Sequence, residues 1–318
     1  METRRLGRQG PALSMIGFGA WAIGGGGYAW GWGEQDDAVS IAAIRRALER
    51  GVNWIDTAPS YGLGRSEEIV GRAVQGLAER PFIATKCGQV WDSLGRIRTN
   101  LRPASIRLEV EASLQRLRVD VIDLYQCHWP DANTPVEETW QTMAALVDEG
   151  KVRYIGVSNF NGGLIHRCLA ARHVDSLQPP YSLLVRGVED ELLPFCATQG
   201  IGVVAYSPMQ SGLLSGRFDP ARLGPDDWRR HDLAYRPPLL EQNLAFVERL
   251  RANAARRGKT PGQLAIAWVL HRHEVTSAIV GVRRPEQAEE DVGGADWQLS
   301  DEELQEIDRA QAETGAAA

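Results

Sequence analysis

The sequence has few of the features that mark secreted, membrane or metal-binding proteins. Its four cysteines (Cys87, Cys127, Cys168 and Cys196) never show the C-x-x-C spacing typical of a zinc site or a redox pair. The apolar runs fall well short of the roughly 18 residues that a membrane helix needs, and the N-terminus has no apolar signal core. We therefore expect a cytoplasmic protein with reduced, buried thiols, no metal and no membrane partner.

Positive charge is also scarce. Lys and Arg number 35 against 41 Asp and Glu, which gives a net charge of -6 at pH 7 and a pI of about 5.6. A surface that binds nucleic acid needs a basic face, so no nucleic-acid partner is expected. With 43% hydrophobic and 24% charged residues, the composition is that of a globular protein, and 318 residues suffice for one large α/β domain or two ordinary ones.

Short apolar runs alternate with amphipathic segments along the whole chain. Strands are predicted at residues 15–19, 52–56, 82–85, 121–127, 154–157, 176–178, 202–206 and 277–280. Helices are predicted at residues 37–50, 66–75, 103–117, 135–149, 161–171, 189–198 and 261–271. Most of the strands are apolar with little alternation, as strands buried on both faces should be. No linker divides the pattern, which favours one closed α/β barrel, a (β/α)8 TIM barrel, over residues 1–318.

The second half of the chain departs from this regular alternation. Residues 217–238 are polar and rich in proline, which predicts a long loop inserted above the barrel. Residues 243–257 have the pattern of an extra helix, and residues 300–310 that of a C-terminal helix opened by a capping box of Ser300 and Glu303. The barrel is therefore expected to carry extra C-terminal helices and long loops at the C-terminal face of its strands.

Four polar residues follow three successive predicted strands. Asp56 ends the second strand, Tyr61 lies in the loop after it, Lys86 follows the third and His128 the fourth. In a barrel of this kind the strand C-termini build the active site. Each residue alone has an ordinary interpretation, as a turn aspartate, a solvated lysine, a surface tyrosine or a structural histidine. Their conjunction at one rim indicates a catalytic site.

This set suits carbonyl reduction, in which the carbonyl oxygen takes up a proton as hydride reaches the carbon. A tyrosine such as Tyr61 can give that proton, although its ordinary pKa near 10 is high for exchange near neutrality. The Lys86 ammonium would lower that pKa, and Asp56 could orient the lysine. A neutral His128 could donate a second hydrogen bond to the developing alkoxide.

Several segments, in order along nearly the whole chain, resemble those of one known family. They are residues 56–62, 85–86, 127–128, 150–160, residue 178 and residues 205–208. They are similar to the catalytic and cofactor segments of the aldo-keto reductase superfamily. Residues 207–217 are closest to the bacterial branch that contains the inositol-operon reductase and the voltage-gated potassium channel β subunits. The resemblance implies hydride transfer between NAD(P)(H) and an aldehyde or ketone, or the reverse.

The resemblance also assigns residue roles. Tyr61 would be the general acid/base, Lys86 and Asp56 its tuning pair, and His128 the donor that orients the carbonyl. Ser158, Asn159 and Gln178 would bind the nicotinamide carboxamide, and Tyr206 would stack on the ring. Ser207, Met209, Gly212, Leu213 and Arg217 would line the pyrophosphate, and Gly281, Arg283, Arg284, Gln287, Glu290 and Asp291 would lie at the adenosine end. The remaining cofactor residues would be Gly19, Trp21, Asp56 and Pro208.

Two positions depart from the family pattern. Gln287 stands where many NADP-preferring members carry arginine, and Asp291 stands where asparagine is usual. Arg283 or Arg284 could bind a 2′-phosphate instead, because a guanidinium suits phosphate geometry. We expect NADP, with NAD possible.

Aromatic residues follow several strands and predict the substrate pocket. They are Tyr28, Trp30, Trp32, Trp91 and Trp129. An aromatic wall suits sugars and hydrophobic aldehydes equally, so the residues leave the small-molecule substrate open.

Three alternatives remain beside a reductase. The same residues would serve a sugar, polyol or glyceraldehyde dehydrogenase working mainly in the oxidative direction. A regulatory subunit with little turnover would keep the barrel and cofactor. An aldolase could use Lys86 as a Schiff base, but would leave Tyr61 and His128 without a joint explanation. The favoured direction and the oligomeric state are not indicated by the residues.

Overall fold

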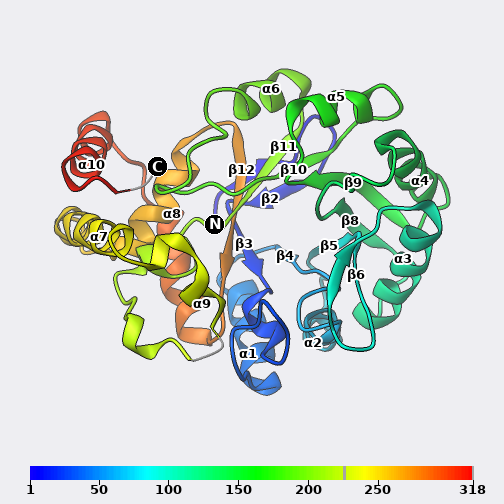
Figure 1. Ribbon diagram of the computed structural model, residues 1–318, viewed down its shortest axis with the longest axis horizontal. Coiled ribbons are helices and arrows are strands. Elements are labelled where there is room, and N and C mark those ends of the chain that lie inside the picture. The colour runs from blue at the N-terminus through cyan, green and yellow to red at the C-terminus, as the bar shows by residue number, and fades with distance from the viewer. Residues whose placement is uncertain (225–226, 317–318) are drawn as a thin grey trace.

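The computed structural model describes residues 1–224 and 227–316, and its centre is a closed barrel of parallel strands (Figure 1). The strands lie in the order β3, β4, β5, β8, β9, β10, β11 and β12, with β12 next to β3 and β9 next to β10. Their bounds are Ile16–Gly19, Trp54–Asp56, Phe82–Cys87, Ile122–Cys127, Val152–Ser158, Ser176–Gln178, Gly202–Tyr206 and Val275–Gly281. Each coincides with a predicted strand, so the predicted TIM barrel is confirmed.

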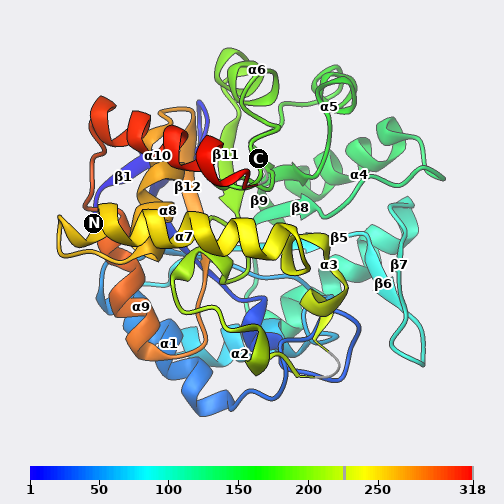
Figure 2. The ribbon, with the colours of Figure 1, turned by 60° about the vertical axis from the view of Figure 1, so that its left-hand side comes forward.

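Helices cover the outside of the barrel. They are α1 (Asp37–Glu49), α2 (Arg65–Val74), α3 (Pro103–Leu117), α4 (Val136–Asp148), α5 (Gly162–Leu169), α6 (Leu192–Gln199), α8 (Pro261–His271) and α9 (Pro285–Asp291). The two predicted extra helices, α7 (Leu239–Ala255) and α10 (Asp301–Thr314), pack side by side beyond this ring (Figure 2). The predicted capping box is present, because Ser300 and Glu303 each accept a hydrogen bond from the other's backbone N–H.

Two short hairpins and one short helix were not predicted. Two antiparallel hairpins pair β1 (Thr3–Arg5) with β2 (Ala12–Ser14) and β6 (Gln89–Trp91) with β7 (Ile97–Thr99). Strands of three residues are too short to show a hydrophobic period. Helix α9 has the polar sequence PEQAEED, which gives no apolar stripe. The predicted loop at 217–238 instead contains three 3-10 turns, Pro220–Arg222, Trp228–His231 and Leu233–Tyr235, and its residues 225–226 lie outside the described part.

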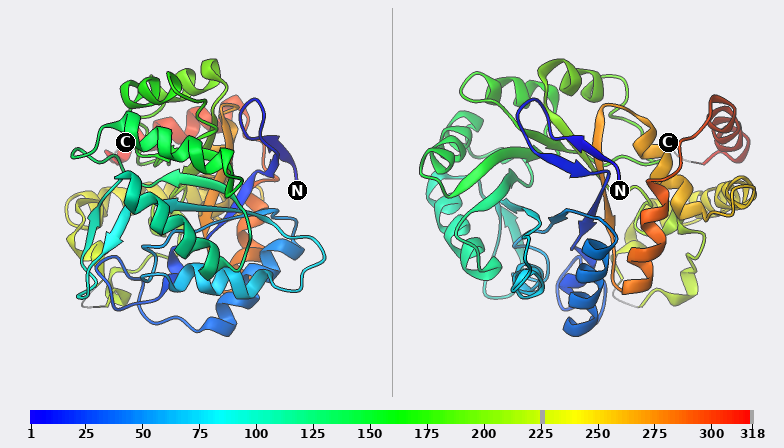
Figure 3. Two further views of the ribbon diagram at one scale, coloured as in Figure 1. Left: turned by 90° about the vertical axis from the view of Figure 1, so that its right-hand side faces the viewer. Right: turned by 180° about the vertical axis from the view of Figure 1, so that it is seen from behind.

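The end of the barrel away from the strand C-termini is plugged by apolar side chains. The β1–β2 hairpin crosses this end (Figure 3), and its residues Leu6 and Leu13 belong to the same buried apolar cluster as Trp54. The indole occupies the space that a side chain at Gly17 would need, since a Cβ there would lie 2.2 Å from the ring. The interior is thus a packed core, and open space is left to the opposite end.

All four cysteines are free and buried, as expected. Among the described residues, each helix is too short or too polar to cross a membrane.

Candidate active site

The four residues predicted to be catalytic meet at the C-terminal end of the strands. Lys86 of β5 is fully buried, and its Nζ lies 2.6 Å from Oδ2 of Asp56, the last residue of β4. Nζ also donates to the carbonyl oxygen of Thr57 at 3.0 Å and to the hydroxyl oxygen of Tyr61 at 3.2 Å. The rings of Tyr61 and His128 meet edge to face with centroids 5.7 Å apart. Asp56, Tyr61 and His128 therefore line one pocket floor, and Lys86 lies buried beneath it.

The hydrogen bonds among these four residues leave the hydroxyl hydrogen of Tyr61 unused. An ammonium has three donors, and those of Lys86 are all used. Because the Tyr61 oxygen accepts one of them, its own hydrogen is available to a substrate. The second oxygen of Asp56 accepts from Nε2 of Gln178 at 2.8 Å, which fixes the carboxylate on both sides.

Burial dominates the electrostatics and corrects one expectation. It raises the pKa of Tyr61 well above its ordinary value, and the Asp56 carboxylate adds to the effect. The sequence had predicted a tyrosine pKa lowered by Lys86. Lys86 itself has its pKa lowered by burial, against the opposing charges of Asp56 and Glu67. At neutral pH Tyr61 is consequently a neutral phenol, the form that gives a proton.

His128 is held in its neutral form. Burial, followed by the charge of Lys86, lowers the pKa of His128 well below its ordinary value. Its Nδ1 is buried without a partner among the residues that the structure describes. We assign the ring proton to Nε2, because a hydrogen on Nδ1 would lack an acceptor. Nε2 can then donate to a carbonyl oxygen in the cavity that His128 lines.

A cavity of about 870 Å³ opens above this floor. Of the residues predicted for the cofactor, all but Leu213 line it; Leu213 is fully buried in the core instead. Among the predicted substrate residues, Tyr28, Trp30, Trp32 and Trp129 line the cavity. Trp91 does not, although Gln89, Ile97 and Thr99 of the same unpredicted hairpin do.

The predicted carboxamide residues form one interlocked group. The Ser158 hydroxyl donates to the Gln178 carbonyl at 2.8 Å, and Nδ2 of Asn159 donates to the Ser158 hydroxyl and to the carbonyl of His128, each at 3.0 Å. Tyr206 donates to Oδ1 of Asn159 at 2.9 Å. The side-chain oxygen of Gln178 keeps its acceptor capacity, which fits an amide such as that of nicotinamide.

The loop after β11 has an unusual backbone. Ser207, Gln210 and Ser211 have φ values of 57°, 45° and 46°, in the left-handed region, and Gly212 follows at 91°. Each such non-glycine residue costs about 1–2 kcal/mol. Strain of this kind gathers at ligand clamps. With Arg217 and Arg284 on the same cavity, this loop fits a pyrophosphate-bearing group.

At the predicted adenosine end the two arginines differ. Arg283 is occupied: it donates to Oε1 of Gln35 at 2.8 Å and to the carbonyls of Trp32 and Glu34 at 2.9 and 2.6 Å. It thereby anchors the loop that follows β3. The Arg284 guanidinium lines the cavity and has no ion-pair partner in residues 1–224 and 227–316. Of these two arginines, Arg284 is the one that could hold a phosphate.

Gln287 caps the N-terminus of its own helix, α9. Its side-chain oxygen accepts from the backbone N–H groups of Arg283 and Arg284 at 2.9 and 3.1 Å. Nearby, Arg217 pairs with Glu290 across the cavity at 2.8 Å.

The sequence did not predict two residues of the inserted loop that contact the site. Trp228 stacks on Trp21 with ring centroids 5.6 Å apart. The Arg229 guanidinium lies 4.7 Å from the Trp32 ring and donates to the Ser211 carbonyl at 3.1 Å. The inserted loop is thus tied both to the aromatic wall and to the strained loop. The only signal in the sequence was a tryptophan beside arginines in an otherwise polar segment.

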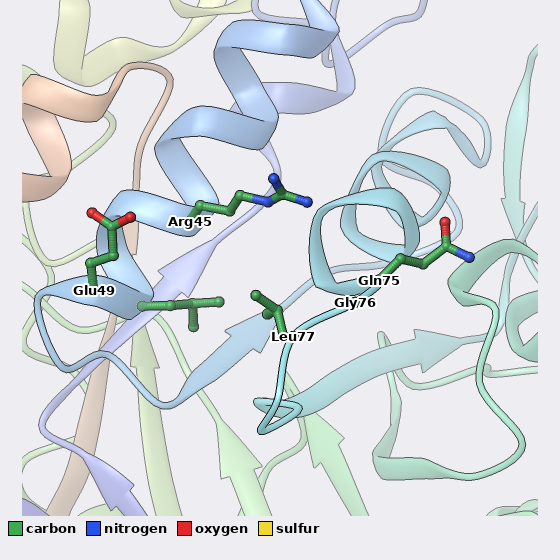
Figure 4. Close-up of a pocket in the computed structure, with 6 residues that line it drawn as sticks. Arg45, Glu49, Gln75, Gly76 and Leu77 are labelled. Atoms are coloured by element: carbon green, nitrogen blue, oxygen red, sulfur yellow. The ribbon is translucent and has the colours of Figure 1, made fainter.

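A second, smaller hollow lies outside the barrel between α1 and the end of α2 (Figure 4). It is lined by Arg45, Leu48, Glu49, Gln75, Gly76 and Leu77.

No group of three or more potential metal ligands (His, Cys, Asp or Glu) occurs in the described ranges.

The fold and site together define a class of enzyme. A model of the aldo/keto reductase family matches residues 15–312, and the chain belongs to this family. It is an oxidoreductase that uses a nicotinamide cofactor to act on carbonyl groups or the corresponding alcohols.

Named relatives span nearly its full length. The chain is 39% identical to "Aldo-keto reductase YhdN" of Bacillus subtilis over 311 residues, 96% of this chain and 92% of that protein. It is 39% identical to "NADH-specific methylglyoxal reductase" of Escherichia coli over 314 residues, 95% of each. Among solved structures, the glycerol dehydrogenase AKR11B4 from Gluconobacter oxydans has a TM-score of 0.89 at 38% identity, covering 98% of this chain and 96% of that chain.

Proposed function

We propose that the protein reduces short-chain aldehydes or 2-oxoaldehydes with NADPH in the cytoplasm. The observation that carries the proposed direction is Tyr61: its side chain is half-buried, its pKa is raised well above the ordinary value, and it keeps its hydroxyl proton free while its oxygen accepts from Lys86. The names of the relatives, a methylglyoxal reductase and a glycerol dehydrogenase, support a small substrate. The family cofactor supplies the hydride.

The chain's own residues would then divide the work. Nε2 of His128 and the hydroxyl of Tyr61 donate to the same carbonyl oxygen, and Tyr61 transfers its proton as negative charge develops there. Lys86 stabilises the tyrosinate that remains, and Asp56 holds the ammonium in place. The aromatic wall excludes water from this exchange.

A steady-state screen tests the proposal. Methylglyoxal, simple aldehydes and aldoses are measured with both reduced cofactors, and glycerol and other polyols with both oxidised cofactors. Reduction with NADPH should have the highest kcat/KM near neutral pH. Faster polyol oxidation at that pH would instead indicate a dehydrogenase, and intact cofactor binding without turnover a regulatory subunit.

Replacing Arg284 with alanine is expected to weaken NADP binding by about 1.5–3 kcal/mol, the usual range for a hydrogen bond to a charged group. NAD binding should hardly change, since it lacks the 2′-phosphate. Arg283→Ala is the matched control: because Arg283 holds the loop at residues 32–35, its loss should affect both cofactors alike. Titrations of both variants with both cofactors measure this. Equal losses in Arg284→Ala would assign the residue to the shared part of the cofactor.

Asp291→Asn is expected to remove a pH dependence of cofactor binding. Burial and the neighbouring Glu290 raise the pKa of Asp291 to about 8, against the opposing charge of Arg217. Below that pH the group is a neutral donor; above it, it is an anion beside an anionic cofactor. Wild-type affinity should therefore fall roughly twofold to fivefold as pH rises through 8, while the variant stays flat. Parallel pH profiles for the two proteins would contradict this.

A further inference from the structure

A fully buried carboxylate lies directly behind the catalytic strand, outside the barrel. Glu67 of α2 accepts a hydrogen bond from Oγ1 of Thr85 on β5 at 2.6 Å, and Nε of Arg116 on α3 donates to its second oxygen at 2.6 Å. Thr85 immediately precedes Lys86. Because successive side chains of a strand point to opposite faces, Thr85 faces the helices while Lys86 faces the site. Glu67 thus holds the strand from the side opposite to the ammonium.

Its neighbour Ser66 holds the adjoining strands. The Ser66 hydroxyl donates to the carbonyl of Ala20, just past β3, at 2.8 Å, and lies 2.9 Å from Oγ1 of Thr57, just past β4. The Ser66 backbone N–H donates to the carbonyl of Tyr61 at 3.1 Å. Both side chains are fully buried. Two consecutive residues at the start of α2 therefore connect the ends of three strands and the backbone of Tyr61.

This arrangement matters because the contact it supports is sensitive to small displacements. The Lys86–Tyr61 contact is 3.2 Å, and it joins residues from two different segments. A misplacement of about 1 Å in a catalytic group can cost on the order of 100-fold in rate. We propose that Glu67, together with Ser66, is a positioning residue that keeps Lys86 and Asp56 in register with Tyr61.

Few titratable groups surround Lys86 and Glu67. Lys86 faces Asp56 of β4, Tyr61 of the following loop and His128 after β8, and the charge of Glu67 acts on it from the other side of β5. The Glu67 charge raises the pKa of Lys86, second to Asp56 in effect, while burial lowers it.

Glu67 in turn faces Arg116 and Glu109, both of α3. Glu109 accepts from the backbone N–H of Gly88 at 2.8 Å, and burial raises the pKa of Glu109 to about 7. Glu109 therefore changes its charge near neutral pH, in the range that a pH–rate profile covers. Glu67 acts both through its hydrogen bond to Thr85 and through its charge.

Two substitutions separate contact from charge. Glu67→Gln removes the charge: kcat should fall roughly 10-fold or more, cofactor affinity should stay within about twofold, and the high-pH limb of the rate profile should move to lower pH, because the pKa of Lys86 falls. Thr85→Val removes the hydroxyl but keeps the ion pair of Glu67 and Arg116. It should lower kcat without moving the limb.

The other end of the same strand supplies a matched control. Asp123 is also buried, accepts from the backbone N–H of Ile83 at 2.9 Å and pairs with Arg80 at 2.6 Å. Asp123→Asn should lower the melting temperature yet leave kcat and the pH profile of the folded enzyme unchanged.

The inference rests on the proposed roles of Tyr61 and Lys86, and its failure is distinguishable from theirs. Wild-type protein without turnover would overturn the proposed function. Active wild type with unchanged kcat in Thr85→Val, or with an unmoved limb in folded Glu67→Gln, would overturn the positioning role. So would Asp123→Asn if it reproduced the shift. If Glu67→Gln does not fold, Thr85→Val alone decides.

Discussion

Replacing Tyr61 with phenylalanine is expected to abolish turnover, with kcat falling by roughly 10²- to 10⁴-fold, the usual contribution of a positioned acid or base. The phenyl ring keeps the packing against His128 but has no proton to give. Cofactor affinity should stay within a few fold, because the predicted cofactor contacts other than Asp56 lie on other segments. Activity in both directions and fluorescence-monitored cofactor binding, on one preparation, measure this.

Tyr125→Phe provides the matched control for that experiment. Tyr125 lies on β8, is fully buried, and its hydroxyl has no partner among the described residues. Removing this hydroxyl should leave kcat unchanged. A near wild-type rate in Tyr61→Phe would remove Tyr61 from the mechanism.

Lys86→Met is expected to lower activity at neutral pH by roughly 100-fold, most strongly in the oxidative direction. Methionine keeps most of the volume but removes the ammonium, so the pKa of Tyr61, already raised by burial, rises further. Oxidation needs the tyrosinate as base and should recover as pH climbs. Reduction uses the neutral phenol and should lose less at low pH. A pH–rate profile in each direction measures both effects.

The variant also leaves Asp56 as a buried charge without its partner. Breaking a buried pair in this way costs about 3–5 kcal/mol of stability. The double variant Asp56→Asn with Lys86→Met removes both charges and should recover much of that loss without recovering activity. A Lys86→Met profile that is scaled down but not shifted would show that the lysine only positions its neighbours.

The sequence predicted the barrel and its rim because both depend on local patterns. Eight apolar segments with helical segments between them leave little choice of topology, and residues at strand ends such as Asp56 and Lys86 must then share one edge. The β6–β7 hairpin was not predicted, because its strands of three residues are too short to show a hydrophobic period. Trp91 lies in this hairpin and does not line the cavity.

Arg283 and Tyr61 show another limit of the sequence, because contacts between distant parts of the chain set the surroundings of both residues. Sequence could not tell Arg283 from Arg284, because the difference lies in carbonyls some 250 residues away, to which only Arg283 donates. For Tyr61, the sequence predicted a pKa lowered by Lys86 and did not indicate the burial that raises it. Desolvation depends on packing around a group, and packing is set by the completed fold.

The burial of the cysteines affects how fast reactive carbonyl compounds can inactivate the folded enzyme. Aldehydes and 2-oxoaldehydes are electrophiles that attack thiolates. Burial raises the pKa of Cys168 and of Cys196 to about 12, and raises the pKa of Cys87 well above its ordinary value. Thiolate, not thiol, is the reactive nucleophile. Cys127 is also fully buried, out of reach of a reagent in solution. Chemical inactivation by reactive carbonyls would therefore have to begin at exposed arginines and amines, and the working lifetime of the folded enzyme would be independent of added thiol reductants.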